Sequence, residues 1–276
     1  MNQHTAAPTS PVSIARTLYN HRNLLMQLVR RDVIGRYKGS VLGIFWSLAN
    51  PILLLGMYTF VFAIVFKARW GTGVSESKTQ YALLLFVGMI VHGLFAETLQ
   101  RAPVLIISNV NYVKKIVFPL EILPVMALCS ALFHATVSSG VLIAALFAIN
   151  GSVSWTVVFL PIVLLPLIVL TMGISWGLAS LGVYLRDVAH PIGLAMTILL
   201  FASPVFYPLS ALPQYLSPWL MLNPLSFIIE QARDVVVFGN TPNWTGLAIY
   251  ISISMIVCWS GYVWFQRTRK GFANVL

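Results

Sequence analysis

The sequence is poor in charged residues and nearly free of cysteine. Only 9% of its 276 residues are Asp, Glu, Lys or Arg, whereas soluble globular domains carry about 25%. The two cysteines, Cys129 and Cys258, both lie in apolar runs, which excludes a disulfide framework and gives no metal or redox signal. Hydrophobic residues make up 58% of the chain. A soluble fold of this size cannot bury that much apolar side chain, so lipid must be the solvent for much of the surface.

The motifs of common catalytic sites are also missing. The chain contains no GxxxxGK[ST] phosphate loop, no HExxH motif and no Cys/His cluster with metal-ligand spacing. We therefore expect no ATPase activity, no catalytic residue, no metal and no cofactor in this chain. The first forty residues contain no apolar run long enough for a cleavable signal peptide, so we expect the first span to start membrane insertion itself.

Acidic residues are scarce, with 7 Asp and Glu against 17 Lys and Arg, and the net charge is +10. In a soluble chain this imbalance would indicate nucleic-acid binding. Here the basic residues lie between apolar blocks, as expected for charges that fix membrane topology. We therefore expect no nucleic-acid partner.

Five segments are apolar over the roughly 20 residues that a helix needs to cross the hydrocarbon core. They are residues 41–66, 80–96, 122–149, 155–185 and 244–265. Another stretch, 188–229, has no Asp, Glu, Lys or Arg but contains six prolines. Because proline interrupts helices, this stretch cannot be one straight helix.

The positions of the basic residues decide the topology. They cluster before the first span, between the second and third spans, at Arg186 and from Arg267 onward. The positive-inside rule places all these clusters in the cytoplasm. Between Arg186 and Arg267 the chain must then cross an even number of times, so the proline-rich stretch supplies one crossing, at about 192–206. Six spans result, with both ends cytoplasmic.

Two features near the first span each allow two interpretations. The basic run at 31–40 either anchors the chain to anionic lipid or belongs to an interfacial helix, although Asp32 interrupts its apolar stripe. Tyr58, Phe62 and Phe66 follow i, i+4, i+8 spacing. Such a stripe packs against a neighbouring helix or lipid, or lines a conduit in which sugars stack on the rings.

The segment 109–119 lies on the inside between the second and third spans. Asparagine near its start is a helix-capping residue, and Pro119 would end a short helix before the third span. The segment is either a plain loop or a short basic helix that contacts a partner protein.

The ionisable residues near the spans give little support to an ion-coupled carrier. Glu97 falls just past the predicted second span, and His134 is mid-span without an evident partner. We expect His134 to be a hydrogen-bonded core residue. A carrier would need mid-span carboxylates or internal repeats, and a membrane-embedded transferase would need an acidic or His cluster at one membrane face. The pairs Gly39/Gly43 and Gly173/Gly177 would permit close helix contacts without identifying an oligomer.

Three motifs distributed along the chain are informative together. They are RYKGSVLG at 36–43 followed by Trp46 and Asn50-Pro51, LRDV at 185–188, and NPLS at 223–226 followed by Glu230 and Arg233-Asp234. The chain resembles ABC-2 type transporter permeases, in the branch that exports polysaccharides such as O-antigen, capsule and teichoic acid. The resemblance covers nearly the whole chain and has the same number of spans.

This resemblance implies an all-α integral membrane domain over residues 1–276. Residues 1–40 would be a cytoplasmic tail with an interface helix, 41–208 spans one to five, and 209–240 short re-entrant gate helices on the outside. Residues 244–266 would be the sixth span, and 267–276 a cytoplasmic tail.

The resemblance also implies roles for individual residues. The substrate conduit would be lined by Tyr58, Phe62 and Phe66. The lipid head group would be met by Arg30, Arg31 and Arg36. Coupling to the ATPase would use Asn109, Asn111, Tyr112, Lys114 and Lys115. The external gate would contain Trp219, Asn223, Glu230 and Arg233.

The implied partners are a second copy of the chain, a separate nucleotide-binding subunit and a lipid-linked glycan in the bacterial inner membrane. O-antigen is the first substrate expected. Capsule, teichoic acid or a small amphiphile or drug are the alternatives.

Overall fold

The computed structural model describes residues 10–66, 70, 78–114, 118–209, 220 and 222–276. All regular elements in this part of the chain are helical, which confirms the predicted fold class. The principal helices are α1 (Pro11–Asn20), α2 (Arg22–Gly35), α3 (Trp46–Tyr58), α4 (Lys78–Leu105), α5 (Val110–Lys114), α6 (Ile122–Asn150), α7 (Leu160–Tyr184), α8 (Ala189–Ala202), α10 (Pro224–Arg233), α11 (Trp244–Thr268) and α12 (Phe272–Val275). Short 3₁₀ or π segments extend several of them, at Gly43–Phe45, Thr59–Val65, Ile107–Asn109, Trp155–Phe159, Arg186–Val188, Asp234–Phe238 and Arg269–Gly271.

Five helical segments of the described chain are long and apolar enough to cross a membrane. They are Gly43–Phe62, Gln80–Leu105, Ile122–Asn150, Trp155–Tyr184 and Trp244–Val275. Each overlaps a predicted span, but the second continues past residue 96 to Leu105 and the last past residue 265 to Val275.

The proline-rich stretch contains the shorter helix α8. Its 14 residues give a length of about 21 Å, less than the roughly 30 Å of a hydrocarbon core. The helix ends at Ala202 because Pro204 cannot continue it. The crossing predicted at 192–206 is thus a short helix followed by turns.

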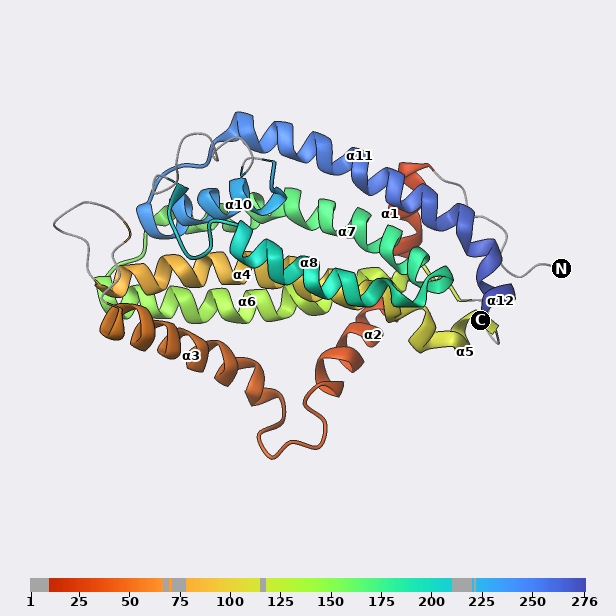
Figure 1. Cartoon of the computed structure of the whole chain (residues 1–276), viewed down its shortest axis with the longest axis horizontal. Helices are drawn as coiled ribbons and strands as arrows, with labels where there is room; N and C mark the ends of the chain where they lie inside the picture. Colours follow the sequence, from red (N-terminus) through yellow and green to blue (C-terminus); the bar gives the residue numbers. More distant parts are fainter. Residues whose placement is uncertain (1–9, 67–69, 71–77, 115–117, 210–219, 221) are drawn as a thin grey trace.

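The long helices lie side by side along the long axis of the molecule (Figure 1). Both ends of the described chain, α5 and the turn between α7 and α8 gather at one end of the bundle (Figure 1). The connections from α6 to α7 and from α10 to α11 lie at the other end. Most segments predicted to be on the inside therefore share one end, whereas the turn between α2 and α3 lies nearer the middle of the long axis (Figure 1).

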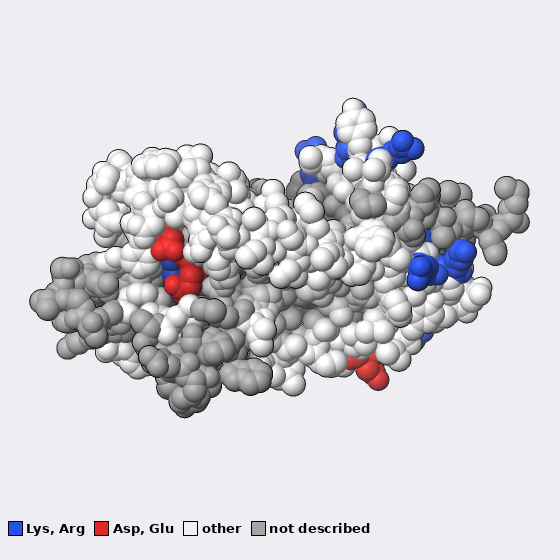
Figure 2. All heavy atoms as spheres, turned by 90° about the horizontal axis from the view of Figure 1, so that it is seen from above, with Lys and Arg blue, Asp and Glu red and all other residues white. Residues whose placement is uncertain are grey.

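Charged side chains are absent from the middle of the face shown in Figure 2. A band of uncharged residues separates a small group of charged side chains near one end from the Lys, Arg and acidic side chains spread over the other half of this face. Because charged groups are costly in hydrocarbon, this band is the part of the surface suited to lipid.

Helix α4 forms the centre of the bundle. In its most apolar stretch of 18 residues, 78% of the residues are buried. It packs against α6, α7, α8 and α10. Its segment Leu83–Leu85 is almost fully buried. A polar side chain on this helix therefore needs a protein partner.

Helices α7 and α11 pack against each other more extensively than any other pair. Their backbones touch at two glycines, because a Cβ on Gly173 would overlap the backbone of Cys258 and one on Gly261 would overlap the carbonyl of Gly173. Gly173 of the predicted small-residue pair thus brings two helices of one chain together, while Gly177 faces open space.

Candidate functional site

A groove of about 330 Å³ lies between α3, α4 and α6, beside the end of α2. This volume is at the lower end of the range of small-molecule sites. Its polar lining comes from Arg36, Tyr37, Ser47, Asn50, Tyr58, Glu97 and His134. The rest of the wall is mainly apolar and includes Leu54, Phe86 and Ile90. The groove thus combines a cationic and polar part with an apolar wall.

The turn after α2 places Arg36 at this groove. Helix α2 packs against α6, and α3 packs against α6 and α4, and between them the chain leaves the bundle and turns back toward it (Figure 1). Gly39 and Gly43 have φ angles of +90° and +52°, a backbone region that favours glycine. These two glycines therefore make the turn, and the helix contact that their spacing suggested is not what they form.

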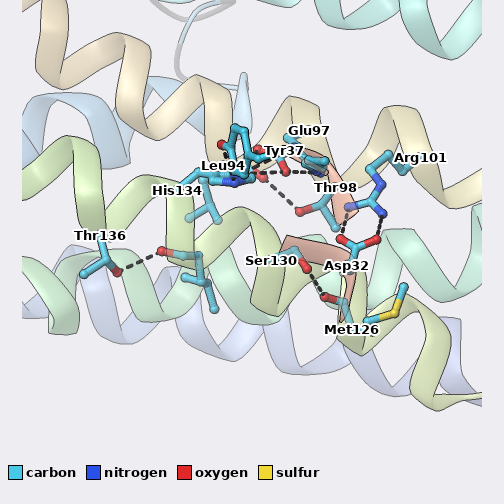
Figure 3. A network of polar contacts seen from close by, with 12 residues as sticks. Asp32, Tyr37, Leu94, Glu97, Thr98, Arg101, Met126, Ser130, His134 and Thr136 are labelled. Atoms are coloured by element: carbon cyan, nitrogen blue, oxygen red, sulfur yellow. Dashed lines mark hydrogen bonds and ion pairs between the residues drawn. The ribbon is translucent and has the colours of Figure 1, made fainter. Parts of the chain in front are cut away.

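Arg36, Tyr37, Glu97 and His134 form one polar network on the groove. Arg36 Nη2 lies 2.5 Å from Glu97 Oε1, and His134 Nδ1 lies 3.1 Å from the same oxygen. The Tyr37 hydroxyl lies 3.3 Å from His134 Nε2. Figure 3 shows Tyr37 and Glu97 converging on His134. The neutral tautomer with the proton on Nδ1 donates to Glu97 and accepts from Tyr37. Arg36 Nη1 also lies 3.4 Å from His134 Nδ1, and this tautomer makes no hydrogen bond to it.

Asp32 and Arg101 form a second ion pair next to this network. Arg101 donates to both carboxylate oxygens of Asp32, at 2.9 and 2.6 Å, and Figure 3 shows the two side chains facing each other. Burial alone would raise the pKa of Asp32, but the hydrogen bonds from Arg101 and Ser130 outweigh it and hold that pKa below its usual value. The pair ties α2 to α4.

The three arginines predicted to meet the lipid head group do not lie together. Arg36 lines the groove. Arg30 and Arg31 line a separate surface groove on α2 together with Lys38. Only Arg36 therefore joins the predicted head-group site to the predicted conduit.

The predicted aromatic stripe has mixed surroundings. Tyr58 is buried and lines the groove. Phe62 stacks on Tyr81 with ring centroids 5.5 Å apart. Phe66 is 67% exposed. Of the three, Tyr58 alone reaches the groove, and Phe62 helps to pack α3 against α4.

Arg233, predicted to be in the gate, is fully buried in α10. Its guanidinium donates to the carbonyls of Leu84 and Val205 at 3.0 and 2.9 Å and pairs with Glu230 at 2.9 Å. It also lies 4.2 Å from the ring centroid of Trp70. Burial lowers the pKa of Arg233 to about 10, so it is still charged at neutral pH. This one side chain connects α10, α4 and the turn after α8.

Asn223 begins α10 and fastens it to the end of α8. Its side-chain oxygen accepts a hydrogen bond from the Leu225 backbone N–H at 2.9 Å, the usual N-cap interaction. Its amide nitrogen donates to Ser203 Oγ at 2.9 Å. The short external helix predicted in 209–240 is therefore present as α10, whereas the predicted gate residue Trp219 lies outside the described residues.

The predicted coupling segment contains the short helix α5, at the end of the bundle that also holds α12 and the turn between α7 and α8. The Asn109 amide donates to the Leu105 carbonyl at the end of α4, at 2.8 Å. Asn111 is exposed, and Tyr112 stacks on Phe118 with centroids 4.4 Å apart. Lys114 ends the helix, and Lys115 lies outside the described residues.

A buried ion pair between Arg269 and Glu121 lies next to the segment that contains α5. Arg269 Nη1 lies 2.9 Å from Glu121 Oε2, with both side chains at most 9% exposed. The Trp176 indole donates to the Glu121 carbonyl at 3.0 Å, and α12 packs against α5. The start of α6 is thereby fixed to α7 and to the end of α11.

Sequence analysis missed the network around Glu97. Helix α4 continues through Glu97 to Leu105, so this carboxylate is not at a span end as expected, and His134 is not isolated. The i, i+4 spacing of Glu97 and Arg101 was the available signal of a longer helix.

Among the described residues, no group of three or more His, Cys, Asp or Glu is arranged to hold a metal.

Residues 23–237 match the ABC-2 type transporter family. The chain is 26% identical over 265 residues to the O-antigen export system permease protein RfbA of Myxococcus xanthus, covering 95% of this chain and 99% of that protein. It is 27% identical over 256 residues to the RfbA protein of Klebsiella pneumoniae, covering 92% and 95%. The Polysialic acid transport protein KpsM of Escherichia coli is 23% identical over 252 residues, covering 88% and 92%.

The family match spans most of the chain and agrees with its all-helical, multi-pass architecture. It also accounts for the missing phosphate loop, because ABC-2 permeases lack ATPase activity and pair with ATP-binding subunits. This chain belongs to the ABC-2 type transporter family and is a membrane permease of that family.

Proposed function

We propose that the chain is the permease subunit of an ABC exporter that moves a lipid-linked polysaccharide across the bacterial inner membrane. O-antigen is the first candidate, because the RfbA relatives match more of the chain at higher identity than the polysialic acid transporter does. The structural observation that carries the proposal is the groove, which has Arg36 beside Tyr58, Ser47 and Asn50. The Arg36 guanidinium can bind a phosphate group, and the Tyr58 ring and the Asn50 amide can bind sugar.

In this proposal, two copies of the chain form the conduit, each with one ATPase. ATP binding draws the two ATPases together and moves the α5 helices, which separates the permease halves. The anionic head group enters from the inner leaflet past Arg36, with Arg30 and Arg31 on the adjacent surface. The sugar chain then passes Tyr58 and the gate around α10, through many weak contacts.

One observation favours a second candidate. The groove has the volume of a small-molecule site and a largely apolar wall, which also suits a small amphiphile or drug.

Reconstitution with the ATPase encoded beside this chain tests both candidates. The complex is placed in nanodiscs, and ATP hydrolysis is measured with a lipid-linked O-antigen glycan, with a capsular glycan lipid and with an amphiphilic dye. The proposal expects the O-antigen lipid to give the largest stimulation. Stimulation by the dye alone would replace the proposal with the second candidate.

Tyr58→Ala tests the conduit within the same complex. Loss of the ring should reduce glycan export while the permease still binds its ATPase, because Tyr58 is distant in sequence from α5 and lines the groove. Phe60→Ala is the matched control, since Phe60 is largely exposed and does not line the groove. Normal surface glycan in the Tyr58 variant would contradict the conduit role.

A further inference from the structure

We propose that Glu97 is a built-in counter-ion that holds Arg36 while the groove is empty and gives way to the phosphate of the substrate. Glu97 would then be a specificity-determining residue of the head-group site. This inference rests on the proposed function, in which Arg36 receives an anionic lipid head group.

The contact between the two side chains is of a kind that a phosphate can replace. One carboxylate oxygen of Glu97 meets one guanidinium nitrogen of Arg36 at 2.5 Å. Arginine binds phosphate most strongly through two parallel N–H donors. A phosphate ester that approaches Arg36 can therefore offer a better geometry than the single-oxygen contact, and it can carry more negative charge.

The partial exposure of Arg36 and Glu97 also permits a phosphate to replace Glu97 as the partner of Arg36. The Arg36 and Glu97 side chains are 32% and 24% exposed, and both line the groove. The other ion pairs of the described chain differ from this one. Arg101 holds both oxygens of Asp32, while Arg233 and Arg269 are almost completely buried. A ligand in the groove can reach Arg36 without unfolding anything.

His134 keeps Glu97 partnered after the exchange. Its Nδ1 lies 3.1 and 3.2 Å from the two Glu97 oxygens, and the Tyr37 hydroxyl fixes the far side of the ring. When Arg36 turns to a phosphate, the carboxylate retains the His134 hydrogen bond, which avoids the penalty of a buried anion without a partner. Glu97 and His134 lie on α4 and α6, whereas Arg36 lies on the turn after α2. The arginine is therefore the side chain that moves.

This arrangement predicts which molecules the groove accepts. A neutral lipid cannot displace Glu97, because it offers no charge to Arg36. A phosphorylated lipid can displace it, and the competition lowers its affinity. Removal of the Glu97 charge should accordingly strengthen the binding of a phosphorylated lipid and leave that of the matching alcohol unchanged.

The test measures binding of farnesyl diphosphate, farnesol and inorganic pyrophosphate to the permease–ATPase complex in phosphatidylcholine nanodiscs. In Glu97→Gln, the affinity for farnesyl diphosphate should rise about three- to tenfold, the size expected for one partly exposed charge pair. The affinity for farnesol should stay the same. Inorganic pyrophosphate should bind more weakly than farnesyl diphosphate, whereas equal binding would indicate a site for free phosphate and overturn the lipid assignment.

Asp32→Asn is the matched control, because it removes one negative charge from the neighbouring pair and leaves the Arg36 contact in place. It should change the farnesyl diphosphate affinity less than twofold, since Asp32 is bound to Arg101. Glu97→Asp, which draws the carboxylate back by one methylene group, should change the affinity in the same direction as Glu97→Gln and serves if that variant does not fold.

The outcomes separate the inference from the proposed function. If Arg36→Gln weakens farnesyl diphosphate binding but the Glu97 variants do not strengthen it, the counter-ion role is wrong and the head-group role of Arg36 stands. If Arg36→Gln leaves the binding unchanged, the proposed head-group site itself fails. An equal gain in Asp32→Asn would reduce the effect to general electrostatics and would also overturn the inference.

Discussion

Arg233 and Arg36 each pair with a glutamate, yet their surroundings are opposite. Arg233 has no exposed surface and donates to two backbone carbonyls as well as to Glu230. Arg36 is partly exposed on a groove and has a single-oxygen contact with Glu97. A fully partnered, buried pair mainly contributes to the folded structure, whereas a loosely held, exposed pair contributes little to stability. The comparison separates a structural arginine from one that is available to a ligand.

The largest effect on folding is expected for Arg233→Met. The change leaves Glu230 and two backbone carbonyls without their donor, and breaking a buried pair in this way costs about 3–5 kcal/mol. The measurement is the temperature at which the detergent-solubilised chain loses its monodisperse peak in size-exclusion chromatography. Arg267→Met, at an exposed position, is the control, and equal melting of the two variants would contradict a structural role for Arg233.

Gly88→Val should destabilise the same region by a smaller amount. A Cβ on Gly88 would lie 3.2 Å from both Arg233 Nη2 and the Val205 backbone, so a branched side chain must push the buried arginine aside. Overpacking of this kind costs about 1–3 kcal/mol. Gly93→Val on the same helix meets no atom within 4 Å and should fold nearly normally. Thermal unfolding of the pair gives the comparison, and the prediction fails if Gly93→Val is the less stable variant.

Asp32→Asn should have a modest effect that depends on pH. The pKa of Asp32 in the folded chain lies below 3.8, so its ionised form stabilises the fold above that value and the contribution is lost as the pH falls through the folded pKa. The variant should be less stable by about 1 kcal/mol across roughly pH 5 to 8, with the difference vanishing in stronger acid. Thermal unfolding at several pH values measures this. If the stability difference between Asp32→Asn and the unmodified chain disappears between pH 8 and pH 6, a group other than Asp32 is responsible for it.

Arg36→Gln should have the smallest effect on folding, less than about 1 kcal/mol, because its ion pair is partly exposed. Under the proposed function, it should nevertheless abolish stimulation of the ATPase by the lipid-linked glycan. Arg36→Lys, which keeps the charge without the planar fork, should retain part of the stimulation. Melting temperature and ATPase activity of the same preparations provide the measurement, and a large loss of stability in Arg36→Gln would remove the contrast with Arg233.

The membrane itself made much of the fold predictable. A bilayer demands long apolar runs, so the five long spans were all found, and the ends of three of them were predicted closely. The positions of Lys and Arg indicated that segments such as α5 and Arg186 share one end. The C-terminal limit of α8 was less clear, because no charged residue follows the helix before Glu230. Only the backbone chemistry of Pro204 ends that helix.

The network at the groove was beyond the reach of hydropathy. Arg36 and His134 are 98 residues apart, and no local pattern records which helix faces meet. The predicted second span stopped at residue 96 because a charged residue follows. The helix continues because Arg36 neutralises Glu97, which also contacts His134 on α6, and Asp32 on α2 neutralises Arg101. Tertiary contacts, rather than local propensity, therefore set that boundary.

The backbone contact between Gly173 and Gly261 has a mechanical consequence. Two helices that touch without intervening side chains cannot slide or rotate past each other unless the carbonyl of one passes through the Cα of the other. Under the proposed function, α7 and α11 would therefore move as one unit during transport. Widening of the conduit would then occur on the opposite flank, where two glycines form the turn between α2 and α3 and the partly exposed Arg36–Glu97 pair connects this turn to α4.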